Sequence, residues 1–236
     1  MFSILLKLVV FVGIGLLLTA VPEWQNNVLM NAEVSGWVGY FNTLKLNAVL
    51  LLFAYLSFRY FYRKYSPAKT LIFQFTAWGV VGLLFEWFLI NHPPGSGAIQ
   101  YGMFVYWAAV FTVPALFILE QAKPIRLKLF GFIVGTAILM IIGSIILLKV
   151  DPTKGFLLVF ILASWVLIYS AIISFFFRTM SYPPKTKLLV LVAILVPIAE
   201  MALAFPFDFI VFLTTIFCLY WYVIKYLSFK NASLKT

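Results

Sequence analysis

The polar residues that could do chemistry in this chain are few, and its acids stand inside or beside apolar runs. Glu200 follows Pro197 within the run LVPIAEMAL, and Asp208 comes shortly after it, behind FPF. A carboxylate in apolar surroundings can bind a proton or a cation, or can act as an acid–base group. Because only Phe205–Phe207 separates the two runs, we expect these carboxylates to be near neighbours.

A second acid stands close to the only histidine of the sequence. Glu86 precedes Trp87, and His92 follows in the segment NHPPG. If helix packing brings these residues together with the first pair, they form an acidic cluster with one histidine. The candidate ligand- or proton-binding residues are therefore Glu200, Asp208, Glu86 and His92. The alternative for Glu200 is a protonated or hydrogen-bonded side chain that joins helices, and for His92 an exposed loop residue.

Other polar residues have simpler interpretations. The acids Glu23, Glu33 and Asp151 fit solvated loop charges. Asn47 and Gln74 lie inside apolar runs, where we expect interhelical hydrogen bonds.

Several chemistries are excluded by what the whole sequence lacks. One histidine rules out a bis-histidine haem and a histidine-rich di-iron site. One cysteine, Cys218, rules out a thiol–disulfide relay and a cysteine-based zinc site. Ser96 lies in a Gly-Ser-Gly segment typical of a turn, and its one potential base is four residues away in a loop. The sequence predicts no cofactor and no metal, and it identifies no catalytic residue.

The composition fixes the class of the elements that hold these residues. The chain has 236 residues, of which 64% are hydrophobic and 10% are charged. Soluble domains have roughly 45–50% apolar and about 25% charged residues, and a soluble protein of this size could not bury so much apolar surface. Helices satisfy their own backbone in lipid. We therefore predict an all-α, polytopic transmembrane helix bundle.

Apolar runs of about 20 residues predict the crossings, because that length spans about 30 Å of hydrocarbon. Eight runs qualify, which makes residues 1–236 one transmembrane domain with an interfacial outer loop at 22–43 and a cytoplasmic tail at 227–236. The runs are Phe2–Val21, Leu44–Tyr62, Thr70–Ile90, Tyr101–Leu119, Leu129–Leu148, Gly155–Phe177, Leu188–Ala204 and Phe207–Tyr226.

The cations predict the orientation. With the N-terminus inside, only Lys45, Lys149 and Lys154 of the 17 Lys and Arg residues face outward. Lys and Arg in short loops favour the cytoplasmic side, so the alternation indicates that both termini lie inside. This bias also explains the net charge of +10 without a nucleic-acid partner. If the first run is a cleaved signal peptide, seven spans remain and the later assignments stand.

Three functions fit these features. The first is a protein that binds or passes a proton, a small cation or an amphiphile at an outer-leaflet acidic site. The second is an accessory or scaffold subunit of a membrane complex, consistent with 26 phenylalanines and few polar groups. The third is an embedded enzyme acting on a lipid or isoprenoid. The partners expected are the lipid bilayer and a second membrane protein or copy of this chain, in a bacterial or archaeal cytoplasmic membrane.

Overall fold

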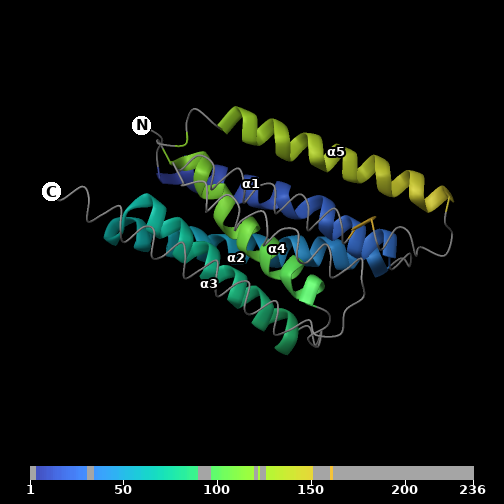
Figure 1. Cartoon of the computed structure of the whole chain (residues 1–236), viewed down its shortest axis with the longest axis horizontal. Coiled ribbons are helices and arrows are strands. Elements are labelled where there is room, and N and C mark those ends of the chain that lie inside the picture. The colour runs from blue at the N-terminus through green and yellow to red at the C-terminus, as the bar shows by residue number, and fades with distance from the viewer. Residues whose placement is uncertain are drawn as a thin grey trace.

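The computed structural model describes residues 4–30, 35–89, 97–119, 122, 126–150 and 160–161. All elements in these ranges are helices, which confirms the all-α class. They are α1 (Ile4–Trp24), the π-helix η1 (Gln25–Met30), α2 (Ser35–Lys64), α3 (Pro67–Phe88), α4 (Gly97–Ile118) and α5 (Arg126–Val150). The five α-helices lie along a common long axis, and successive helices run in opposite directions (Figure 1).

Four of the described helices are long and apolar enough to cross a membrane, and they indicate an integral membrane protein. The membrane-length segments are Ile4–Leu29, which covers α1 and most of η1, Gly36–Lys64 of α2, Lys69–Phe88 of α3 and Arg126–Val150 of α5. The fourth predicted run corresponds to α4, whose apolar stretch is shorter, at Gly102–Ile118. Of the last three predicted runs and the tail at 227–236, the structure describes only residues 160–161. The count of eight spans therefore stays a prediction.

Helix replaces most of the outer loop expected at 22–43. Pro22 lies inside α1, and η1 continues the chain to Met30 before α2 begins at Ser35. The rings of Trp37, Tyr40 and Phe41 contact one another, with centroids 5.2 to 6.3 Å apart, on the first turns of α2. Their i, i+3, i+4 spacing is that of one helix face. The helix continues through Pro22 and passes into the π-helical turn of η1 three residues later.

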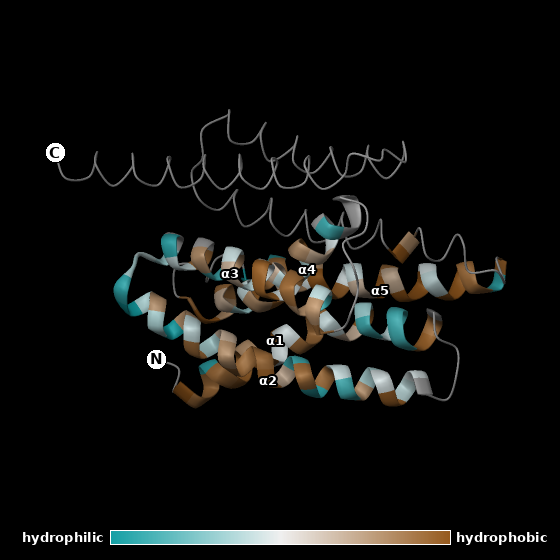
Figure 2. Cartoon of the chain, turned by 90° about the horizontal axis from the view of Figure 1, so that it is seen from below, coloured by the Kyte–Doolittle hydropathy of each residue, from teal (hydrophilic) through white to brown (hydrophobic). Residues whose placement is uncertain are grey.

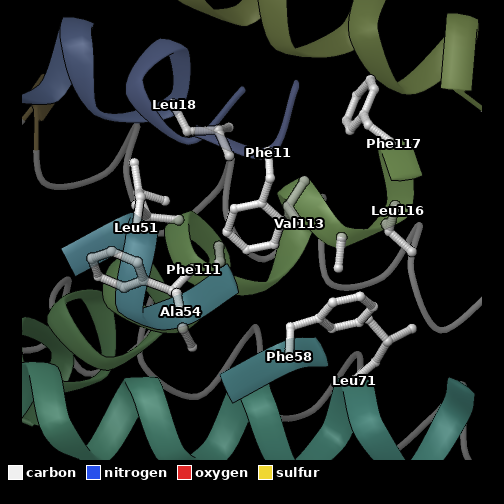
Figure 3. Close-up of a cluster of buried hydrophobic side chains, with 14 of the residues drawn as sticks. Phe11, Leu18, Leu51, Ala54, Phe58, Leu71, Phe111, Val113, Leu116 and Phe117 are labelled. Atoms are coloured by element: carbon white, nitrogen blue, oxygen red, sulfur yellow. The ribbon is translucent and has the colours of Figure 1, made fainter. Parts of the chain in front are cut away.

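The core of the described bundle surrounds α4. All the side chains from Phe104 to Leu119 are buried, whereas the other helices bury only one side. A helix that is hydrophobic all round belongs in the interior. Figure 3 shows Phe111 and Val113 of α4 among Phe11 of α1 and Ala54 of α2. The helices α1, α2 and α3 thus pack around α4.

Two glycines of α3 let it approach α4 closely. A Cβ atom on Gly79 would lie 2.5 Å from the ring of Phe104, and one on Gly82 would lie 2.1 Å from Cγ of Trp107. Small residues at helix interfaces in membranes allow such backbone proximity. The pair α3–α4 is accordingly the most extensive contact in the described bundle.

A hydrogen-bond network between α2, α3 and α4 confirms the expected role of Gln74. Its amide nitrogen donates to the carbonyl of Ala54 at 2.8 Å and to that of Phe111 at 3.4 Å. Ser57 donates to its amide oxygen at 3.0 Å, and Trp78 donates to the Ser57 hydroxyl at 3.3 Å. One buried glutamine thereby joins three helices.

Helix α5 lies at the edge of the described bundle, next to α1 (Figure 1). Only four of its side chains are buried, namely Leu129, Ile133, Met140 and Ser144. Its remaining surface is mainly apolar (Figure 2). At its start, Arg126 donates to the carbonyls of Leu116 and Leu119 at 3.4 and 2.6 Å, which satisfies acceptors at the end of α4.

Candidate functional site

Of the four predicted site residues, the structure describes Glu86. His92, Glu200 and Asp208 lie outside the described residues, so their expected approach to Glu86 stays a prediction. Glu86 lies in the last turn of α3 and accepts a hydrogen bond from the indole nitrogen of Trp107 on α4, at 3.1 Å. This contact shows that Glu86 faces the bundle.

The structure adds Glu23, which was expected to be a solvated loop charge. That expectation is wrong, because Glu23 belongs to the last turn of α1 and is partly buried. Tyr106 of α4 donates its hydroxyl to Glu23 Oε1 at 2.7 Å. Asn27 of η1 donates to Glu23 Oε2 at 3.1 Å and to the Glu23 carbonyl at 3.0 Å. A carboxylate inside a membrane-length helix is thus held by neutral donors.

The two acids accept hydrogen bonds from neighbouring residues of α4. Glu86 lies near enough to Glu23 for the two carboxylates to repel each other. Their hydrogen-bond donors, Tyr106 and Trp107, are consecutive residues whose rings are 5.7 Å apart in an edge-on arrangement. The two side chains therefore connect one acid from α1 and one from α3 to neighbouring positions of α4.

Asn47 of α2 adds a buried and unsatisfied amide to this group. Its side chain is 1% exposed and lies beside the Glu23 carboxyl. Neither the nitrogen nor the oxygen of its amide forms a hydrogen bond of acceptable geometry. Asn47 is therefore close to Glu23 but is not hydrogen-bonded to it. The interhelical hydrogen bond expected for Asn47 is therefore not formed. A buried polar group without a partner is costly and calls for an explanation.

The residues Glu23, Asn27, Asn47, Glu86, Tyr106 and Trp107 are called the two-acid cluster below. The cluster lies towards the end of the bundle where α1 ends and α2 begins. More polar contacts lie at this end. Gln25 donates to Ser144 of α5 at 2.8 Å, and Trp87 donates to Gln100 of α4 at 2.7 Å.

The π-helix brings Asn27 to the cluster. Pro22 has no amide hydrogen to donate to Leu18, and the wider turn of η1 begins three residues later. Two glycines of α2 make room for η1: a Cβ on Gly36 would lie 2.4 Å from the Asn27 carbonyl oxygen, and one on Gly39 would lie 3.0 Å from Asn27 Oδ1. Single π-helical turns occur often at functional sites.

The side chains of the cluster offer mainly oxygen atoms as potential ligands. The cluster has two carboxylates, a phenol and two amide groups. Among the described residues no Lys or Arg pairs with Glu23, and no three His, Cys, Asp or Glu side chains lie together. Such a group can hold a proton or bind a small hard cation through oxygen.

Neither a protein-family model, nor a curated protein, nor a solved structure matches this chain.

Proposed function

We propose that this chain is a multi-pass membrane protein that binds a small cation, an alkali metal ion or a proton, at the two-acid cluster. The observation that carries the proposal is the Asn47 amide, which is buried beside the Glu23 carboxyl without a hydrogen-bond partner. A metal ion would use the amide oxygen as a ligand. A proton on Glu23 would make that carboxyl a donor to the same oxygen.

The energetics of the two acids support an added positive charge. Placing one charged side chain in a membrane-spanning helix has a cost, which reaches about 2.5–3.5 kcal/mol at the helix centre on insertion scales. Glu23 and Glu86 add mutual repulsion to that cost. Tyr106, Asn27 and Trp107 lower it by hydrogen bonding but contribute no positive charge. A proton or a cation would remove the repulsion.

The donor set favours a singly charged ion. Calcium takes 6–8 oxygen ligands with several carboxylates, and zinc prefers thiolate and imidazole. The described cluster has two carboxylates and a few neutral oxygens, which suits an ion that needs less charge compensation.

The distribution of Lys and Arg residues suggests on which side of the membrane the two-acid cluster lies. In the proposed arrangement of eight spans with both termini inside, Glu23 lies about 24 Å along α1 from Lys7 and Glu86 about 25 Å along α3 from Lys69. Both carboxylates then lie at one depth, near the outer surface of a bacterial or archaeal cytoplasmic membrane. Glu200, Asp208 and His92 remain proposed members of the same outer-side site.

Thermal melts and infrared spectra of the purified protein in detergent test the proposal. In sodium or potassium chloride, wild type should melt at a higher temperature than in choline chloride of equal ionic strength. A cation present at ten times its dissociation constant stabilises the folded state by about 1.4 kcal/mol. If a proton is bound instead, the infrared spectrum should contain a protonated-carboxyl band that Glu23→Gln removes.

Three variants sharpen the test. Glu23→Gln should lose the cation response, whereas Asp151→Asn, which also removes one negative charge, should keep it. Asn47→Leu should weaken the response to a metal ion by removing a ligand oxygen. If wild type shows neither a cation-dependent melt nor a protonated-carboxyl band sensitive to Glu23, the two-acid cluster does not bind a cation and the proposal is wrong.

A further inference from the structure

A group of cations lies at the opposite end of the bundle, where α2 meets α3. It consists of Arg59, Arg63, Lys64 and Lys69, called the basic cluster below. The sequence contains no Asp or Glu between residues 34 and 85, and no described carboxylate forms an ion pair with these cations. Arg63 and Lys64 are exposed, and Figure 2 shows hydrophilic residues at these helix ends. The positive charge of the turn is therefore uncompensated within the described residues.

Aromatic rings accompany the basic cluster. Lys64 donates to the Tyr60 hydroxyl and lies 4.1 Å from the centroid of that ring. Four rings continue from α2 to α3 with centroid distances of 5.4 to 6.3 Å, namely Tyr60, Phe61, Tyr65 and Phe73. Aromatic side chains in membrane proteins concentrate at the depth of the lipid headgroups. The rings therefore indicate that the cations lie at that depth.

An apolar stripe on α2 leads from the cations along the helix. Phe53, Leu56 and Tyr60 are spaced by three and four residues, which places them on one face, and all are more than half exposed. Lys64 continues the same face by one more turn. This arrangement matches an amphiphile whose anionic head is at Lys64 and whose chain runs along Leu56 and Phe53.

We propose that the basic cluster binds the phosphate of an anionic phospholipid in the surrounding leaflet. Lys and Arg beside membrane helices attract anionic headgroups, and each such cation contributes about fivefold to affinity. The exposed apolar stripe favours a lipid over free phosphate, because only a lipid carries acyl chains to cover it. This inference is independent of the two-acid cluster, which lies at the other end of the helices.

Native mass spectrometry of the detergent-solubilised protein tests the inference, with phosphatidylglycerol and phosphatidylcholine as probes. Wild type should retain phosphatidylglycerol in preference to phosphatidylcholine, and excess inorganic phosphate should not displace it. Arg63→Gln, Lys64→Gln and Lys69→Gln should each weaken retention about fivefold. The exchange Lys64→Arg, which keeps the charge, should leave retention unchanged.

The matched control is Lys45→Gln combined with Lys149→Gln, which removes cations outside the basic cluster. This variant should bind phosphatidylglycerol as wild type does. Circular dichroism of each variant checks that the helices are intact. Equal retention of the two lipids by wild type overturns the inference, as does equal retention of phosphatidylglycerol by wild type and all three single variants. Full displacement by inorganic phosphate would show that the cluster binds a free anion and would also overturn it.

Discussion

Gln74 and Thr112 are both buried polar residues in the middle of the bundle, yet they differ in hydrogen bonding. Gln74 connects α2, α3 and α4 through its amide. Thr112 is 1% exposed, and its hydroxyl has no hydrogen-bond partner. An unpaired buried polar group destabilises the folded state, whereas a paired one is costly to remove. The two residues should therefore respond in opposite ways to apolar substitution.

The first prediction compares Gln74→Leu with Thr112→Val. Gln74→Leu should lower the free energy of unfolding by about 1 kcal/mol, because it removes the donor to two carbonyls. Thr112→Val keeps the shape of the side chain and should leave the stability unchanged or raise it. Titration with a denaturing detergent measures both. Equal destabilisation by the two variants would contradict the hydrogen-bond assignment of this region.

At the scale of elements, the contact of α3 with α4 links packing to the two-acid cluster. The atoms that a Cβ on Gly82 would meet are Cβ and Cγ of Trp107, close to the α4 backbone. The atoms facing Gly79 belong to the far edge of the Phe104 ring, which can move. Trp107 in turn donates to Glu86. Any displacement of α4 at Gly82 should therefore also disturb that hydrogen bond.

The second prediction is a graded glycine series. Gly82→Ala should destabilise the protein by about 1–3 kcal/mol, as overpacking does, and Gly79→Ala should cost less. Gly131→Ala on α5 is the control, because a Cβ there would meet nothing within 4 Å. It should be neutral or slightly stabilising, since alanine favours helix. Thermal melts rank the three, and a Gly82→Ala variant as stable as Gly131→Ala would contradict the close packing of Gly82 against Trp107.

The first five predicted runs correspond to helices of the structure, and the ends of those runs were less predictable. Hydropathy located α1 to α5 because each carries a long apolar stretch. It missed the first turns of α2, before Leu44, where Ser35, Asn42 and Thr43 lower the average hydropathy. The spacing of Trp37, Tyr40 and Phe41 was the available signal for helix there. Hydropathy measures transfer to lipid and does not detect a polar helix end.

The candidate site was predictable only in part, for a similar reason. Glu86 was identified as a candidate because it lies within the predicted run Thr70–Ile90, close to His92. Glu23 comes just after the predicted run Phe2–Val21, in the expected outer loop, where a charge is normally solvated. The π-helical continuation and the hydrogen bond from Tyr106 depend on packing between segments 83 residues apart. A single sequence does not contain that pairing.

At the scale of the whole molecule, the orientation in the membrane determines what each end of the bundle meets. The described helices alternate in direction (Figure 1). The two-acid cluster and the basic cluster therefore lie towards opposite surfaces. The proposed arrangement places the first at the outer surface and the second at the cytoplasmic surface.

The third prediction tests this orientation by cysteine labelling in a Cys218→Ser background. Ser96→Cys and Thr153→Cys should react with a membrane-impermeant reagent in intact cells, and Lys235→Cys only after the cells are opened. The physical reason for this expected labelling pattern is that loops rich in Lys and Arg favour the cytoplasmic side. Labelling at position 96 from the cytoplasmic side alone would reverse the assignment of both clusters.

The burial of α4 on every side has a consequence for how this protein can evolve. A helix that faces lipid can exchange one apolar residue for another, because acyl chains adapt to any shape. On α4, each side chain from Phe104 to Leu119 meets other side chains, so a change there requires compensating changes in its neighbours. We therefore expect divergent descendants of this protein to vary freely along α5 and to retain α4 nearly unaltered. The positions that vary least among such descendants should therefore be those in the interior of the bundle.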